Sequence, residues 1–102
     1  MNRERVLAAL QAHASALKAI GILSMSLFGS TARGEAGRDS DVDIAVRLGD
    51  NFSTGGFDYF GRLEALEQRL SRIVGCRVDV VEEPSRKRRF QERIDRDRAL
   101  VF

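Results

Sequence analysis

The sequence is poor in the residues that hold small proteins together through covalent or metal cross-links. It has one cysteine, Cys76, and one histidine, His13, so it predicts no internal disulfide and no cysteine–histidine set for zinc. No apolar run approaches the roughly 18 residues of a membrane span, and the N-terminus lacks the apolar core of a secretory signal. We therefore expect a single cytoplasmic domain, residues 1–102, built around one hydrophobic core.

The net charge is small, but the charged residues are unevenly distributed along the chain. The formal net charge is only +2, yet residues 85–98 carry seven basic and three acidic side chains. The rest of the chain is mildly acidic, whereas a general nucleic-acid binder usually has a broad basic surface. The composition makes no strong case for direct nucleic-acid binding. It leaves open whether the basic cluster Arg86–Arg89 contacts a partner, RNA or only solvent.

The hydrophobic pattern predicts a small α/β (α+β) domain. Apolar residues at helical spacing predict helices over 3–19, 57–74 and 86–98, with Val101 as an inward-facing position at the end of the last one. A short helix is expected over 30–34, with Ser30 as its N-cap. Strand patterns cover residues 22–28, 41–48 and 76–81. Together these elements predict a mixed sheet of three or more strands packed with helices.

Two aspartates alternate with apolar residues in the strand predicted over 41–48. Strand geometry places Asp41 and Asp43 about 6.6 Å apart on one face. Asp79 also lies between two apolar residues, so it would lie beside Asp43 if the two strands pair. Clustered carboxylates repel one another unless a cation is bound, and Mg²⁺ prefers such oxygen ligands. An isolated pair of this kind is more often a turn or cap, so the metal interpretation depends on its context.

That context is a glycine–serine pair at the end of the preceding strand. Gly29 allows the backbone to approach a ligand closely, and Ser30 offers a hydroxyl and an N–H group at a helix start. Arg33 and Arg38 follow closely enough to neutralise a triphosphate. Each feature is weak alone. A glycine–serine bend followed by an acidic strand indicates a site for nucleotide phosphates and metal.

These residues resemble a known signature. Leu27-Phe28-Gly29-Ser30, then ten residues, then Asp41-Val42-Asp43-Ile44 is similar to the motif of the polymerase-beta-like nucleotidyltransferase superfamily. The run GSTARG at 29–34 resembles its minimal nucleotidyltransferases, including the antitoxins of HEPN/MNT toxin–antitoxin pairs. The resemblance implies the nucleotidyltransferase fold and roles for five residues: phosphate binding by Gly29 and Ser30, and metal binding and catalysis by Asp41, Asp43 and Asp79.

The resemblance also implies a reaction and a partner. AMP would pass from ATP to an acceptor hydroxyl, with two Mg²⁺ ions at the phosphates. A chain this short lacks the lobe with which larger relatives enclose an acceptor, so we expect a second protein to complete the site. Minimal nucleotidyltransferases are commonly paired with a HEPN-type ribonuclease toxin, which they neutralise by adenylylating a tyrosine. A hetero-oligomer of antitoxin and toxin is the resulting expectation.

Three alternatives remain open at the level of sequence. The chain could neutralise its toxin by contact alone, although three retained carboxylates argue for catalysis. The acidic pair could belong to a glycosyltransferase, which the short chain and the glycine–serine element disfavour. A polynucleotide-tailing enzyme is disfavoured by the mildly acidic body of the chain and the lack of an RNA-binding lobe.

Overall fold

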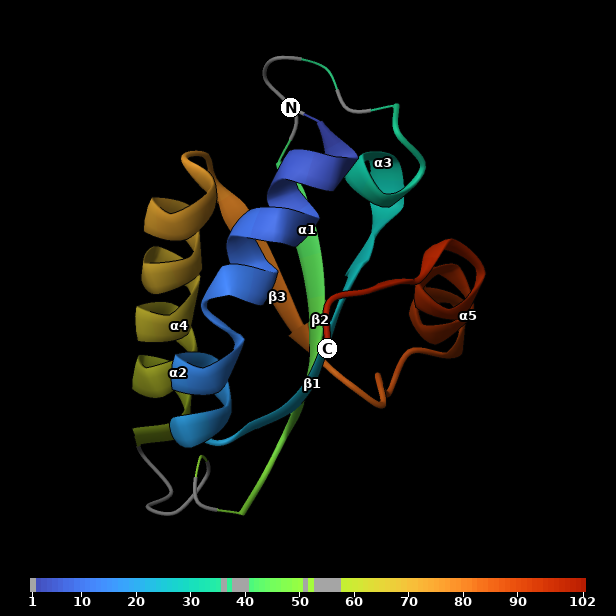
Figure 1. The fold of residues 1–102 in the computed structure, drawn as a ribbon. Helices are drawn as coiled ribbons and strands as arrows, with labels where there is room; N and C mark the ends of the chain where they lie inside the picture. The colour runs from blue at the N-terminus through green and yellow to red at the C-terminus, as the bar shows by residue number, and fades with distance from the viewer. Residues whose placement is uncertain (1, 36, 38–40, 51, 53–57) are drawn as a thin grey trace.

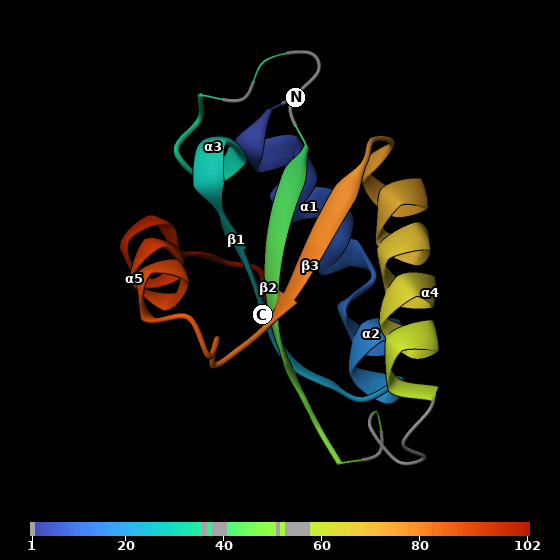
Figure 2. The same ribbon diagram turned by 180° about the vertical axis from the view of Figure 1, so that it is seen from behind.

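The chain folds into a mixed sheet with helices on both faces (Figures 1 and 2). The computed structural model describes residues 2–35, 37, 41–50, 52 and 58–102. Within that part the elements are α1 (Arg3–Ala12), α2 (Ala14–Ala19), β1 (Ile22–Phe28), α3 (Gly29–Ala32), β2 (Val42–Leu48), α4 (Asp58–Val74), β3 (Val78–Glu82), α5 (Arg88–Asp97) and β4 (Ala99–Leu100). The strand order is β3-β2-β1-β4, which confirms the predicted α/β class.

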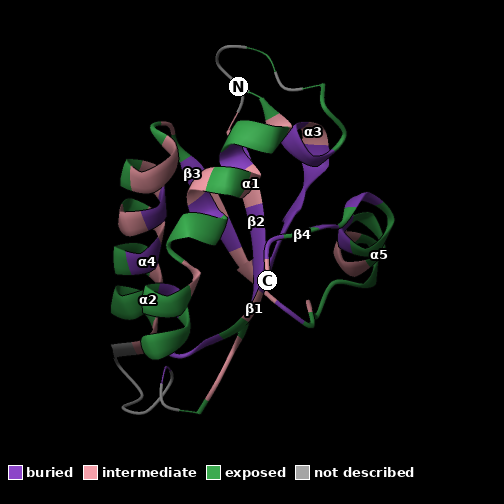
Figure 3. Ribbon diagram, in the orientation of Figure 1, coloured by how far each residue is buried: buried purple, intermediate pink, exposed green. Residues whose placement is uncertain are grey.

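The larger part of the core lies between the sheet and helices α1, α2 and α4 (Figure 1). Apolar residues of β2 alternate toward this side, so Val42, Ile44 and Val46 are completely buried. The strands of the sheet are largely buried beneath these helices (Figure 3). The helices contribute four buried leucines to this core: Leu10, Leu17, Leu66 and Leu70. None of the helices in the described ranges is long and apolar enough to cross a membrane.

Helix α5 packs on the opposite face of the sheet (Figure 2). Phe28, Ala45 and Ile94 form a smaller buried cluster there, and Phe90 packs edge-on against Phe28 with ring centroids 5.7 Å apart. Near the start of β2 and β3 this face carries two acidic residues, Asp43 and Asp79.

The single helix predicted over 3–19 is wrong, because the structure divides it at His13. Nδ1 of His13 lies 2.9 Å from the carbonyl oxygen of Ala9, in the place of the backbone donor that would continue the helix. The N–H of His13 instead donates to the carbonyl of Leu10, one residue short of the helical spacing. A side chain thus competes with the backbone for one acceptor.

The last helix also differs from the prediction. It begins at Arg88, two residues later than predicted, and ends at Asp97, one residue earlier. Lys87 is its N-cap, and the N–H of Lys87 donates to the hydroxyl of Ser85. Val101 is buried but not helical. Ala99–Leu100 pair antiparallel with β1 as β4, and the N–H of Val101 donates to the carbonyl of Met25 at 2.8 Å. A strand of two residues is too short to show alternation in a sequence.

Buried ion pairs fix α5 to the rest of the domain. The carboxylate of Glu83, whose side chain is 1% exposed, accepts hydrogen bonds from Arg98 and from the amide of Gln91. Arg98 also donates to the hydroxyl of Ser26 on β1 at 3.0 Å. These hydrogen bonds, those of Arg98 first, hold the pKa of Glu83 below its usual range despite its burial. The network therefore sets where α5 lies over the sheet.

Replacing Glu83 with glutamine should lower the free energy of unfolding at pH 7 by about 2–3 kcal/mol, since charge-assisted hydrogen bonds to Arg98 are lost. A lowered pKa means that the stabilisation is present above the usual carboxylate pKa and disappears as pH falls through the lowered one. The difference between variant and wild type should therefore shrink from pH 7 toward pH 3. Urea denaturation across this range measures it.

The matched control is E92Q on the same helix. Glu92 forms an exposed ion pair with Arg88, and such pairs contribute little to stability, so this variant should stay within about 0.5 kcal/mol of wild type. Equal effects of E83Q and E92Q at pH 7 would contradict the assigned role of the buried network.

Candidate active site

The predicted pairing of two aspartates is confirmed by the sheet register. Strands β2 and β3 run parallel, and Asp43 lies directly opposite Asp79. Since their neighbours Val42, Ile44 and Val78 point into the main core, both aspartates point to the α5 face. Asp41 lies two residues earlier, just before β2 begins, and its carboxylate is 4.0 Å from Nε of Arg77. The sequence thus brings at least two carboxylates together at one edge of the sheet.

The glycine bend lies against this pair. Gly29 follows Phe28, which is the register partner of Asp43 on β1, and it takes a positive φ of 74°. A Cβ atom at this position would collide with Oδ2 of Asp43 and lie 3.3 Å from its Cγ. Only glycine allows both this backbone conformation and this close approach. The backbone of the bend therefore contacts the carboxylate itself.

Ser30 lies in the first turn of α3. The prediction that Ser30 is the N-cap of this helix is therefore wrong. The ladder of helical hydrogen bonds begins at Gly29, whose carbonyl accepts from the N–H of Arg33 at 3.2 Å, and Phe28 occupies the cap position. Ser30 is half-buried, and its hydroxyl makes no hydrogen bond to any other residue that the structure describes. Its hydroxyl is therefore not used to cap the helix.

Of the two arginines predicted to lie near the phosphates, Arg33 is described by the structure and Arg38 is not. The guanidinium of Arg33 is 2.7 Å from Oδ2 of Asp97 and 3.0 Å from Oε2 of Glu35, so it joins α3 to α5. It remains close enough to act on the charge of Asp43. Arg38 lies outside the described residues. The role of Arg33 toward a nucleotide stays a prediction.

The charge of the site is unbalanced. Burial raises the pKa of Asp43, and the neighbouring carboxylates of Asp79 and then Asp41 raise it further, while Arg93 and Arg33 counteract this rise. Mutual repulsion between carboxylates in one place is relieved by binding a cation. The site therefore favours positive charge at the point where β2 and β3 begin.

Arg93 is the site residue that the sequence reasoning missed. It lies on α5 with its guanidinium 5.6 Å from the centre of the Phe90 ring, and Phe90 packs on Phe28 beside the glycine bend. The signal was available, because Phe90, Arg93 and Ile94 share one face of the helix predicted over 86–98. Arg93 thus brings a cation to the same face as the carboxylates.

The donor chemistry fits magnesium. No group of three or more histidine, cysteine or acidic side chains is already gathered into a metal site among the described residues. Two facing carboxylates with a third nearby are instead the kind of donor set that Mg²⁺ uses, since it takes one or two protein oxygens and completes its shell with water and phosphate.

This fold and this arrangement of glycine bend and acidic strands define a nucleotidyltransferase domain. The model of the nucleotidyltransferase domain family matches residues 10–101, and the chain belongs to that family. The chain is 36% identical over 88 residues to the protein adenylyltransferase MntA of Thermococcus cleftensis, covering 85% of this chain and 83% of the relative. A Methanocaldococcus jannaschii protein, provisionally named a protein adenylyltransferase, is 38% identical over 64 residues, covering 63% of this chain and 60% of the relative.

Solved structures show the same fold. One, provisionally named a minimal nucleotidyltransferase, superposes with a TM-score of 0.77 at 30% identity and covers 97% of this chain and 95% of its own. A toxin–antitoxin crystal structure with AMP-PNP superposes with a TM-score of 0.69 at 21% identity, covering 100% of this chain and 73% of its own.

Proposed function

We propose that this chain is a Mg²⁺-dependent protein adenylyltransferase that transfers AMP from ATP to a hydroxyl, expected to be a tyrosine, on a HEPN-type toxin and so acts as its antitoxin. The observation that carries the proposal is the meeting of Asp43, Asp79 and the Gly29 bend at one point of the sheet. The relatives named protein adenylyltransferase support the reaction. The toxin–antitoxin structure with an ATP analogue has the same fold and motivates the partner.

Each residue has a distinct task in this proposal. Asp41, Asp43 and Asp79 would hold two Mg²⁺ ions, which when bound neutralise charge on the phosphate oxygens of ATP. Gly29, which is buried against Asp43, and the uncommitted hydroxyl of the half-buried Ser30 would orient the β- and γ-phosphates. Asp79 would also accept the proton of the attacking hydroxyl, since it lies on the edge strand of the sheet.

The cations on the α5 side complete the electrostatics. Arg93, held over the Phe90 ring, and Arg33, held by Asp97, would face the triphosphate as fixed positive charges. Positioned charges contribute more to phosphate transfer than mobile ones, because no reorganisation is needed during the reaction. In this proposal the ion pair between Arg33 and Asp97 would therefore contribute to catalysis as well as to folding.

The proposal is tested with ATP labelled at either the α- or the γ-phosphate, added to the chain and its co-purified partner. Adenylyl transfer predicts that label appears on the partner from α-labelled ATP only, and that EDTA abolishes it. Label from γ-labelled ATP would show phosphoryl transfer and overturn the proposal. Neutralisation of the toxin with no label at all would favour an antitoxin that acts by contact alone.

A further inference from the structure

A groove runs along the side of the domain that faces away from the carboxylates. One hollow of about 350 Å³ lies between the end of α2 and α4, and a second of about 570 Å³ continues from it toward α1. The two share Arg69. Their lining residues are Ile20, Phe52, Arg62, Ala65, Leu66 and Arg69 for the first, and His13, Arg69, Arg72 and Ile73 for the second.

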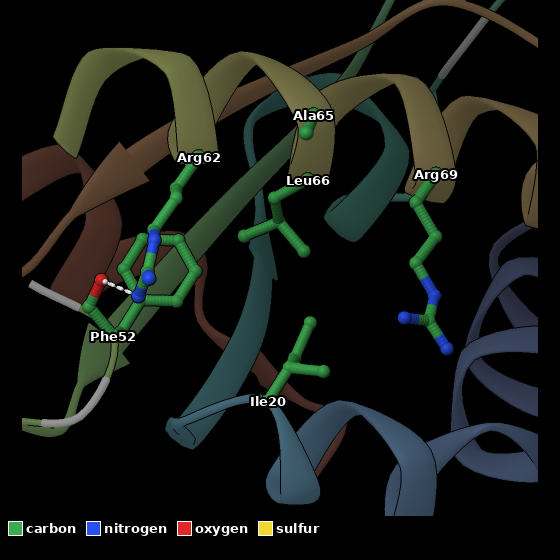
Figure 4. A pocket seen from close by; sticks show the side chains of 6 residues that line it. All are labelled: Ile20, Phe52, Arg62, Ala65, Leu66 and Arg69. Atoms are coloured by element: carbon green, nitrogen blue, oxygen red, sulfur yellow. Dashed lines mark hydrogen bonds between the residues drawn. The ribbon is translucent and has the colours of Figure 1, made fainter. Parts of the chain in front are cut away.

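The floor of the first hollow is apolar. Figure 4 shows Leu66 pointing from α4 and Ile20 pointing from the end of α2 toward the same space, with Ala65 beside them. Ile20 is 37% exposed although it is a large apolar residue. Arg62 turns toward the loop, where it donates to the carbonyl of Phe52 at 2.9 Å. Ile20 and Ala65 therefore leave apolar surface open to a ligand, whereas Leu66 and Phe52, 2% and 3% exposed, form the closed bottom of the hollow.

The charge of the groove is of one sign. Arg62, Arg69 and Arg72 line it together with His13, and none of the described residues that line the two hollows is acidic. Arg69 is half-buried and has no hydrogen bond or ion pair with any other residue in the described part of the chain. The five N–H donors of this partly buried guanidinium have no acceptor among the described residues. A carboxylate is the group that pairs best with them.

The length of the groove selects the kind of ligand. The lining positions 62, 65, 66, 69, 72 and 73 form one face of α4 and extend about 16 Å along its axis. That is too long for a single small anion and matches about three turns of a helix laid in a groove. An apolar floor between cations disfavours RNA, whose backbone contacts need charge but not buried apolar surface.

We propose that this groove binds an acidic amphipathic helical segment of a partner protein, with its apolar residues on Ile20 and Ala65 and its carboxylates on Arg69 and Arg72. The interaction does not depend on the transferase proposal, because the groove lies on the α1/α2/α4 side of the sheet and the acidic site on the α5 side. A partner held here would leave the nucleotide site open.

The test is titration of the ¹⁵N-labelled chain with a 14-residue helical peptide carrying leucines on one face and glutamates beside them, without ATP. Amide shifts should be confined to the end of α2 and the groove face of α4. A peptide with glutamine for every glutamate should bind at least about tenfold more weakly, and so should R69Q with the acidic peptide. R89Q removes an exposed arginine on α5 and serves as the matched control, with unchanged affinity.

A second variant, A65E, places a carboxylate on the floor and should also weaken binding of the acidic peptide. The proposal is overturned if the acidic peptide causes no shifts at millimolar concentration, or if the shifts fall on Arg86–Arg89. It is also overturned if the glutamine peptide binds as well, or if a uridine oligonucleotide shifts the groove residues at lower concentration than the peptide.

Discussion

Replacing Asp43 with asparagine should lower the rate of AMP transfer about 10³-fold or more without unfolding the protein. The variant removes one charge at the point where Asp43 faces Asp79. In the proposed reaction, the metal held there would supply several kcal/mol of stabilisation of the transferred phosphate. The folded state should not suffer, because the pKa of Asp43 is raised by burial and by repulsion from Asp79. Removing that repulsion leaves the melting temperature unchanged or higher.

Two measurements distinguish loss of activity at the site from unfolding of the variant. Adenylyl transfer is followed with α-labelled ATP, and thermal unfolding is followed with and without Mg²⁺. Mg²⁺ should raise the melting temperature of the wild type and have a smaller effect on D43N. Asp50, an exposed carboxylate just beyond the other end of β2, gives the control D50N, which should behave as wild type. Transfer by D43N within tenfold of wild type would reject the assignment of Asp43.

Replacing Gly29 with alanine should both destabilise the domain and abolish most of its activity. The positive φ of 74° costs an alanine about 1 kcal/mol, and the collision of its Cβ with Asp43 adds about 1–3 kcal/mol of overpacking. The displaced carboxylate should lower the transfer rate at least 10²-fold, because a shift of about 1 Å in a reacting group has that effect.

Two other glycines separate the backbone effect from the collision. Gly34 and Gly75 have φ values of 74° and 79°, but a Cβ at either position would meet nothing within 4 Å. G34A and G75A should therefore lose only the backbone contribution of about 1 kcal/mol in urea denaturation and keep full transferase activity. If G29A is no less stable than G34A, the close approach of the bend to Asp43 is not the reason for glycine at this position.

The local part of the site could be predicted from the sequence. Strand β1 has the predicted bounds, Ile22–Phe28, because a glycine with a required positive φ ends it. Alternation placed Asp43 on the face opposite Val42 and Ile44, and the matching pattern around Asp79 led to the correct partner. These features depend on periodicity within a few residues, which a sequence displays directly.

The remaining features depend on contacts between distant residues. Arg33 pairs with Asp97, 64 positions away, and Arg93 reaches the site only because α5 crosses the sheet beside β1. Neither pairing follows from local pattern. The break at His13 was missed for a different reason, since a side chain there replaces a backbone donor within an otherwise regular helical pattern.

The parallel register of β2 and β3 makes the spacing of the chain decide whether Asp79 lies beside Asp43. Side chains in a strand alternate with a period of two, so sliding β3 by a single position would turn Asp79 inward among the leucines and expose Val80 in its place. The length of the three-residue turn between α4 and β3, numbered 75–77, therefore sets the register of β3 against β2. We expect a deletion or insertion of one residue in that turn to abolish adenylyl transfer, although every carboxylate remains in the sequence.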